Sequence, residues 1–223
     1  MTSHGRWAVE RIGGRAAELH ARAVPGPPAR VVEVLTVECP AVVLGSTQPD
    51  AVVDRDAAAA AGVDVVRRRS GGGAVLLVPG ESLWVDAVLP PSDALWADDV
   101  GRSFHWLGQA WADALADLGV AAEVHHGGLC VTEWSRLVCF GGLGSGEVTV
   151  AGRKVVGLSQ RRGRWGARFQ CTVHRRWDPA RLLELLALDP AERAAASAAL
   201  EPAVAVVEAT DEQLLAALVR HLP

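Results

Sequence analysis

The stretch Arg67-Arg68-Arg69-Ser70-Gly71-Gly72-Gly73-Ala74-Val75 places three cations directly before a serine and three glycines. Glycines leave the backbone N–H groups unobstructed, so this run suits a ligand whose anion or carbonyl must lie against the main chain. It is not a phosphate-binding loop, because no Gly-Lys-Ser/Thr follows, and it is not a dinucleotide fingerprint, because residues 74–78 read as a strand. Taken alone, it fits a surface loop between two strands equally well.

A second segment that could take part in binding or catalysis is Gly152-Arg153-Lys154-Val155-Val156-Gly157-Leu158-Ser159. Its lysine lies within an apolar, strand-like run, and Gly157 would let a ligand approach the backbone. An ammonium held rigidly in this way can bind an acyl carbonyl or a phosphate and stabilise charge that develops on oxygen. The alternative interpretation is an edge-strand lysine that guards against aggregation.

Cys139 stands at the end of a predicted apolar strand, in Leu137-Val138-Cys139-Phe140-Gly141-Gly142. It reads either as a buried structural thiol or, with an ammonium nearby, as a nucleophile. Cys171 lies three residues before His174, but those positions face opposite sides of a strand, so no Cys–His pair is expected there. The adjacent histidines His125-His126 diverge for the same reason, and no metal site is predicted.

Composition narrows the functional class. The net charge of −4 and the isoelectric point near 6.0 argue against a nucleic-acid binder. No run reaches the roughly 18 apolar residues of a membrane span, and Met1–Trp7 does not read as a signal peptide. We therefore expect a cytoplasmic protein with no nucleic-acid or membrane partner.

The order of elements predicts an α+β fold, with a mixed or antiparallel sheet and flanking helices, because strands and helices do not alternate strictly. We expect a single domain over residues 1–223, with a core at about 30–190 and a short helical tail at 179–223. Residues 25–28, Pro-Gly-Pro-Pro, should break the chain. Strands are predicted at 31–35, 41–44, 63–67, 74–78, 83–89, 122–125, 137–140, 147–150 and 154–158, and helices at 8–22, 54–61, 94–118, 179–187, 190–200 and 210–221.

Three segments, in this order, resemble the lipoate–protein ligase A family, also called the biotin/lipoate ligase catalytic-domain family. Leu44-Gly45-Ser46-Thr47-Gln48-Pro49 is similar to the family's Leu-Gly-x-x-Gln-Asn element. Residues 67–75 contain its Arg-Arg-x-Ser-Gly-Gly-Gly-Ala-Val motif, and residues 152–161 are similar to its lysine motif. The resemblance implies an α+β fold and attachment of a lipoyl or octanoyl group to a lysine of lipoyl carrier domains.

The family contains two mechanisms. Its ligases use ATP and magnesium to form an acyl-adenylate, and the equivalent of Lys154 binds the carbonyl and phosphate of this adenylate. These ligases typically need an accessory domain. Its octanoyltransferases use no cofactor and pass the acyl group from an acyl carrier protein through a cysteine thioester. Val138-Cys139-Phe140 with Glu147 resembles the transferases' Ala-Cys-Phe element, the ligases' Arg-Asn-Asp/Glu segment is missing, and only a short helical tail follows the lysine motif. The thioester route is therefore favoured.

Departures from the family pattern leave a third possibility open, a non-catalytic protein that binds lipoate or lipoyl domains. Pro49, Leu158 and Cys171-Thr172 stand where the family has asparagine, a small residue and His-Gly. The biotin-attaching branch is less similar, because Ser70 with the three glycines matches the lipoate branch.

The resemblance and the residue chemistry together predict the site and its partners. Lipoyl carrier domains of dehydrogenase complexes or of the glycine cleavage system are the expected acceptors, and an acyl carrier protein is the donor on the thioester route. The basic residues Arg161, Arg162 and Arg164 would meet an acidic partner, or form a solvated loop. The predicted catalytic residues are Lys154 and Cys139, and the predicted substrate-binding residues are Arg68, Arg69, Ser70, Gly71, Gly72, Gly73, Ala74, Gly157 and Ser159.

Overall fold

The computed structural model describes residues 7–24 and 29–223. The predicted chain break at 25–28 and all but the last residue of the Met1–Trp7 segment lie outside the described residues. Two sheets and flanking helices make up the described part, which confirms the predicted α+β class with a mixed sheet. Among the described residues, no helix combines the length and apolar character that crossing a membrane requires.

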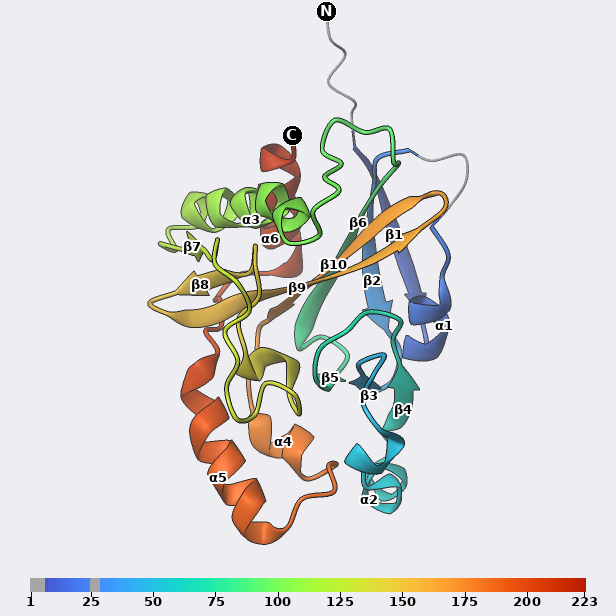
Figure 1. Ribbon diagram of the computed structural model, residues 1–223, viewed down its shortest axis with the longest axis vertical. Coiled ribbons are helices and arrows are strands. Elements are labelled where there is room, and N and C mark those ends of the chain that lie inside the picture. The colour runs from blue at the N-terminus through green and yellow to red at the C-terminus, as the bar shows by residue number, and fades with distance from the viewer. Residues whose placement is uncertain (1–6, 25–28) are drawn as a thin grey trace, which may run out of the picture.

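The larger sheet has seven strands in the order β1-β2-β6-β10-β9-β8-β7, and all neighbouring pairs are antiparallel except β1 with β2 (Figure 1). The smaller sheet has the order β4-β3-β5, in which β3 is parallel to β4 and antiparallel to β5. The strands are β1 (Ala8–Gly14), β2 (Val31–Val37), β3 (Ala41–Leu44), β4 (Asp64–Arg67), β5 (Val75–Leu77), β6 (Ser82–Leu89), β7 (Glu123–Val124), β8 (Val148–Val150), β9 (Arg153–Gly163) and β10 (Gly166–His174).

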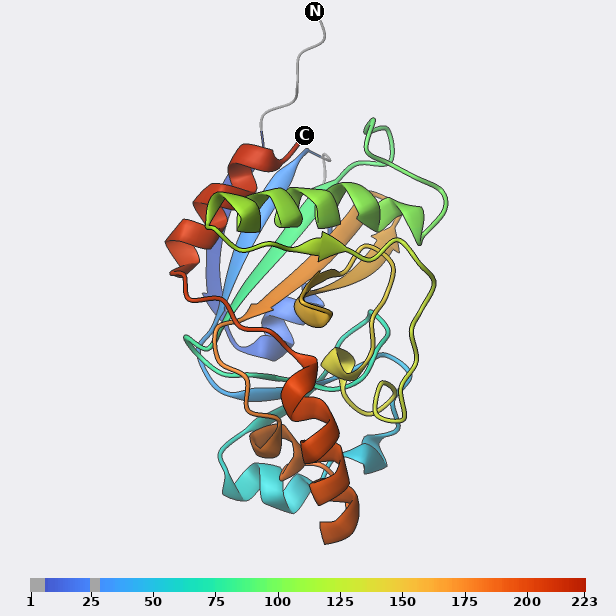
Figure 2. The ribbon, with the colours of Figure 1, turned by 90° about the vertical axis from the view of Figure 1, so that its left-hand side faces the viewer.

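Two helices cover one face of the larger sheet, as Figure 2 shows. These are α3 (His105–Asp117) and α6 (Asp211–His221), and the buried side chains of Trp111, Leu107 and Phe169 belong to the core between helices and sheet. The remaining helices are α1 (Ala16–Ala21), α2 (Arg55–Ala60), α4 (Pro179–Leu183) and α5 (Pro190–Leu200), with 3-10 turns at Asp50–Val52, Arg102–Phe104, Cys139–Gly141 and Glu201–Ala203. Side chains alternate between the two faces along β6 and β10, so every second residue of these strands points away from α3 and α6.

The prediction of one helix at 8–22 is wrong, because strand β1 and helix α1 occupy this segment. Gly13 and Gly14 disfavour a continuous helix, and residues 8–14 instead pair in parallel with the edge of β2. Only Ala16 and Leu19, the buried residues of α1, belong to a helical apolar face.

Two further predicted elements differ in the structure. The helix expected at 94–118 is regular only over α3, because aspartate side chains bind nearby backbone N–H groups upstream, as Asp99 does with Arg102 at 3.0 Å. The strand expected at 137–140 is a single bridge between Ala74 and Val138, followed by a 3-10 turn that begins at Cys139. Cys139 therefore lies at the start of a turn rather than in a strand.

Candidate active site

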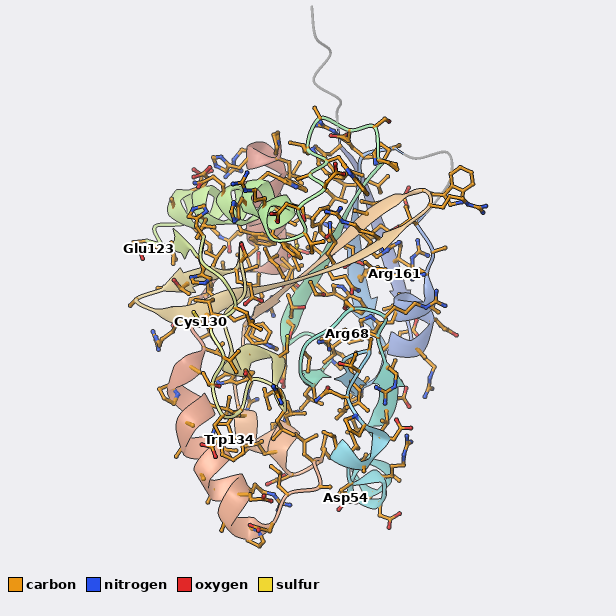
Figure 3. All side chains as sticks on the ribbon, in the orientation of Figure 1. Asp54, Arg68, Glu123, Cys130, Trp134 and Arg161 are labelled. Carbon is orange, nitrogen blue, oxygen red and sulfur yellow. The ribbon has the colours of Figure 1, made fainter. Side chains whose placement is uncertain are left out.

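The glycine loop, residues 70–73, is held in shape by Arg68. The Arg68 guanidinium is buried and donates from Nη2 to the carbonyl oxygens of Gly71 and Gly73, at 2.7 and 2.9 Å, and from Nη1 to Val43, at 3.2 Å. These bonds fold the loop back on the end of β4 and leave little of the guanidinium for a ligand. Figure 3 shows Arg68 near the middle of the molecule.

The backbone at Gly45 approaches the backbone at Gly72 closely, and this explains why glycine occurs at both positions. A methyl group on Gly45 would lie 1.9 Å from the carbonyl oxygen of Gly72, whereas one on Gly71 would meet nothing within 4 Å. Gly72 itself adopts a φ of +99°, a backbone conformation that favours glycine.

Gly45→Ala should therefore destabilise the protein by about 1–3 kcal/mol through overpacking. The matched control, Gly71→Ala, should change the free energy of unfolding by no more than about 0.5 kcal/mol. Denaturant unfolding of both variants measures the difference, and equal effects would show that the Gly45–Gly72 contact is not tight.

The segment that contains Cys139 lies beside the glycine loop. The N–H of Cys139 donates to the carbonyl oxygen of Ala74 at 3.0 Å, and the N–H of Ala74 donates to that of Leu137 at 2.8 Å. A methyl group on Gly73 would lie 2.7 Å from the Cys139 nitrogen, and one on Gly72 would lie 3.4 Å from the Cys139 sulfur. The thiol therefore faces the glycine loop across a contact that only small residues permit.

Lys154, from β9, lies beneath the turn that carries Cys139. Its ammonium is buried and forms an ion pair with Glu147 at 2.7 Å. It also donates to the carbonyl oxygens of Cys139 and Gly142, each at 3.2 Å, and lies 4.7 Å from the centre of the Phe140 ring. This lysine therefore supports the turn. The interpretation of it as an edge-strand lysine that guards against aggregation is wrong, because β9 lies between β10 and β8.

Glu147 and Gly157 complete the support of this turn. The Glu147 carboxylate accepts hydrogen bonds from the backbone N–H groups of Gly144, at 2.7 Å, and Leu158, at 3.0 Å. A methyl group on Gly157 would lie 2.9 Å from the Phe140 ring, so only glycine allows the ring to pack on β9 at that point. The ion pair of Lys154 with Glu147 and the packing of Phe140 on Gly157 thus hold the turn against β9, the strand that carries Lys154.

Two cavities adjoin Cys139. The first lies between the two sheets, encloses about 40 Å³ and is largely apolar. The second is an open cleft of about 610 Å³ lined by Gly71 to Gly73, Lys154 and the exposed apolar residues Leu129 and Val131. Cys139, Leu158 and Ser159 line both cavities, so the thiol stands where a narrow apolar pocket meets a wide cleft.

The glycine loop offers backbone donors to the cleft. Within the described part of the chain, the N–H groups of Gly71, Gly72 and Gly73 make no hydrogen bond to another residue. Successive unpaired N–H groups in a cleft that Lys154 also lines form a favourable environment for an oxyanion or a phosphate.

A chain of polar side chains crosses the floor of the apolar pocket. Ser159 Oγ donates to Ser70 Oγ at 3.2 Å, Ser70 donates to Gln170 Oε1 at 2.9 Å, and Gln170 Nε2 donates to His20 Nδ1 at 3.4 Å. Burial, followed by the charges of Arg68 and Arg168, lowers the pKa of His20 to about 3, so this ring is neutral at physiological pH.

The same face of the sheet carries a buried ion cluster next to this floor. Arg168 pairs with Asp86 at 2.8 Å and with Glu33, which also contacts Arg22 at 3.1 Å. Glu33, Asp86, Gln170 and Ser159 are register partners on β2, β6, β10 and β9. Arg168 is therefore a buried, ion-paired residue beside the floor of the pocket.

His174 is a second buried imidazole near the turn. It is hydrogen-bonded to Ser82 at 3.0 Å and packs against Phe140 with ring centres 4.4 Å apart. Burial, followed by the charge of Lys154, lowers the pKa of His174 from 6.5 to about 4. The folded protein therefore holds this ring neutral in a pH range where the unfolded chain protonates it.

Stability should consequently fall as the pH drops from about 6.5 towards 4, because only the unfolded chain gains the proton in that window. His174 alone should contribute a loss of about 2–3 kcal/mol between pH 7 and pH 4.5. Urea unfolding at the two pH values measures it, and His174→Gln should remove that share of the decrease. An undiminished decrease in the variant would assign the acid sensitivity to other groups.

The structure brings most of the predicted site residues together around the two cavities. Gly71 to Gly73, Lys154, Ser159 and Cys139 line the cleft, and Arg68, Gly157, Ser159 and Cys139 line the apolar pocket. Ser70 lies in the polar chain on the floor, and Ala74 is buried in the bridge to Val138. Arg69 is exposed and lines neither cavity. The pKa of Arg161 is lowered mainly by burial and, to a smaller extent, by the positive charge of Arg69.

The predicted basic patch is largely tied to the protein's own backbone. Arg161 donates to the Arg22 carbonyl oxygen at 3.2 Å, and Arg162 donates to that of Ala97 at 2.5 Å. Arg164 is exposed at the hairpin between β9 and β10, where it lies over Trp165. Arg164 is therefore the most available of the three for a partner.

Sequence reasoning missed several residues that build the site. His20 lay within the wrongly predicted helix, and Gln170 gave no signal because a single polar residue in a strand is common. Gln48 belongs to a quoted motif, and the structure shows its role: it accepts from the Gly45 N–H at 2.9 Å and donates to the Arg136 carbonyl oxygen at 3.0 Å. No group of three or more His, Cys, Asp or Glu side chains that could hold a metal occurs among residues 7–24 and 29–223.

Comparison with known proteins agrees with this architecture. Octanoyltransferase LipM of Exiguobacterium is 29% identical over 149 residues, which cover 63% of this chain and 52% of that protein. The chain thus spans about half the length of the curated relative it matches.

Solved structures show the same fold. An archaeal bipartite lipoate protein ligase, studied with its E2 lipoyl domain from Thermoplasma acidophilum, superposes with a TM-score of 0.76 at 18% identity, covering 98% of this chain and 82% of that one. Lipoate-protein ligase A bound with ATP gives a TM-score of 0.70 at 19% identity, covering 97% and 83%.

The match to a family model covers most of the chain. It spans residues 18–215, from α1 to α6, and so includes the glycine loop, Cys139 and Lys154. The model describes the lipoyl protein ligase A/B catalytic domain. This chain belongs to the family of lipoyl protein ligase A/B catalytic domains.

Proposed function

We propose that this protein attaches an octanoyl or lipoyl group to a lysine of lipoyl carrier domains through an acyl thioester on Cys139. The observation that carries the proposal is the position of Cys139, which lines both the apolar pocket and the open cleft. An acyl group bonded to this sulfur can place its chain between the sheets while its carbonyl remains open to a second substrate.

In the first half-reaction, the Cys139 sulfur attacks the thioester carbonyl of an acylated carrier. A new C–S bond forms, the carrier's C–S bond breaks, and the carrier leaves as its thiol with the proton that Cys139 gives up. Gly71 to Gly73 and Lys154 line the same cleft. The unpaired N–H groups of the glycines, and the positive charge of an ammonium whose own hydrogen bonds go to Cys139 and Gly142, are suited to stabilise the transient oxyanion.

In the second half-reaction, the neutral amine of the target lysine attacks the acyl-Cys139 carbonyl. The amide forms, the C–S bond breaks, and the amine's proton returns to the sulfur. The cleft of about 610 Å³ is wide enough for a lysine side chain to enter beside Lys154. The apolar pocket is far smaller, at about 40 Å³. An eight-carbon chain therefore has to displace its walls.

The competing function is ATP-dependent ligation through an acyl-adenylate. The wide cleft favours it, because unpaired N–H groups in a cleft that also contains Lys154 suit a phosphate as well. Lys154 and the glycine loop would then hold the adenylate phosphate, and ATP with magnesium would supply the activated carboxyl.

Transfer assays separate these routes. The thioester route predicts acylation of a lipoyl domain from octanoyl carrier protein without ATP, unchanged by a chelator of magnesium. Transfer of free lipoate that requires ATP, with no transfer from the carrier protein, would establish the ligase. Binding of lipoate with neither reaction would indicate a non-catalytic binding protein.

A further inference from the structure

The apolar pocket has two chemically different ends. At one end, Phe140, next to Cys139, packs over Gly157 on β9. At the other end, His20 stacks on Trp84 of β6, with ring centres 4.4 Å apart. Thr172 on β10 is the register partner of both Gly157 and Trp84, so the two ends lie two strand spacings apart, about 10 Å. That separation is on the scale of an eight-carbon acyl chain.

His20, which lines this end of the pocket, has a polar atom without a partner. Gln170 Oε1 accepts from Ser70, so Gln170 Nε2 faces His20 Nδ1 as a donor, and the imidazole proton resides on Nε2. This Nε2 atom is shielded from solvent and has no hydrogen-bond partner among the described residues. Buried donors are rarely left unpaired, because the lost hydration is not recovered.

We propose that His20 selects acyl chains whose far end carries a hydrogen-bond acceptor. The proposal rests on the proposed function in one respect, that the acyl chain lies in this pocket with its carbonyl at Cys139. A lipoyl group presents ring sulfur atoms at that end, and an oxygen-bearing chain presents a stronger acceptor. A plain octanoyl chain would leave the Nε2 proton unpaired. The nearby positive charges of Arg68 and Arg168 also favour an acceptor over a donor.

Binding of free acids tests this without any transfer reaction. Octanoate, lipoate and 8-hydroxyoctanoate are titrated calorimetrically into the wild type, His20→Leu, His20→Gln and the lining control Leu77→Met. The preference for 8-hydroxyoctanoate over octanoate should fall about tenfold in His20→Leu, and the preference for lipoate should fall about threefold, because sulfur is a weak acceptor. His20→Gln, which keeps an N–H donor, should retain part of both preferences, and Leu77→Met should retain them fully.

A measurement on the wild type protects the test against a variant that fails to fold. With ¹⁵N-labelled histidine, 8-hydroxyoctanoate should shift the Nε2 resonance of His20 more than octanoate does. Equal shifts, equal preferences in His20→Leu and wild type, or no binding of any of the three acids would overturn the proposal. Acyl transfer that fails while the His20-dependent preference persists would instead overturn the proposed function alone.

Discussion

Lys154→Met is expected to lower acyl transfer by a factor of about 10²–10³, the usual effect of removing one preorganised group that stabilises an oxyanion. The same substitution should also destabilise the protein, because it leaves the buried Glu147 carboxylate without its cation. Breaking a buried ion pair in this way typically costs about 3–5 kcal/mol. Transfer kinetics and urea unfolding measure the two effects separately.

The double variant Lys154→Met/Glu147→Gln distinguishes catalysis from support of the fold. It removes the unpaired charge, and the side-chain amide oxygen introduced by Glu147→Gln can still accept from the N–H of Leu158 or Gly144, as the carboxylate does. Stability should recover in large part while transfer stays low. Recovery of both would show that Lys154 acts only by holding the turn.

Cys139→Ala should reduce transfer from an acylated carrier at least about 10³-fold, because nucleophile removal in covalent enzymes has effects of this size or larger. The pocket and cleft remain open in this variant, so binding of octanoate should persist. The matched control is Cys130→Ala, since Cys130 is exposed and lies outside both cavity linings. Full activity of Cys139→Ala with carrier-bound octanoate would contradict the thioester route.

Cys171 offers a second comparison. It is fully buried on the helix-covered face of the sheet, and burial raises the pKa of its thiol. A thiol that resists ionisation is a poor nucleophile. Cys171→Ala should therefore retain the catalytic rate of the wild type per folded molecule, and any loss should appear in unfolding measurements instead.

Contiguous motifs made the centre of the site predictable. The functional residues of the glycine motif, residues 67–75, and of the lysine motif, residues 152–161, each lie within ten positions. The types of ligand they suit could therefore be inferred before any contact was known. Arg68 shows the limit of this reasoning: a cation beside glycines suggests a ligand, but its protons are taken by loop carbonyls. Only the folded geometry shows where a guanidinium points.

The remainder of the site depends on contacts between distant segments. Glu33, Asp86, Gln170 and Ser159 form a polar row across the sheet because β2, β6, β10 and β9 pair in this register. A shift of one residue in the pairing of a strand would turn its polar side chain to the helix-covered face. The position of His20 follows from the division of residues 8–22 into β1 and α1, which is set by pairing with β2 and not by local propensity. No periodicity within one segment contains that information.

The most direct test of the proposed thioester route is the intact mass of the protein after incubation with octanoyl carrier protein, without ATP or a lipoyl domain. The thioester route predicts one added octanoyl group, absent in Cys139→Ser, present in Cys130→Ala and released by hydroxylamine. An unmodified mass, in a preparation that acylates a lipoyl domain only when ATP and free lipoate are supplied, would contradict it.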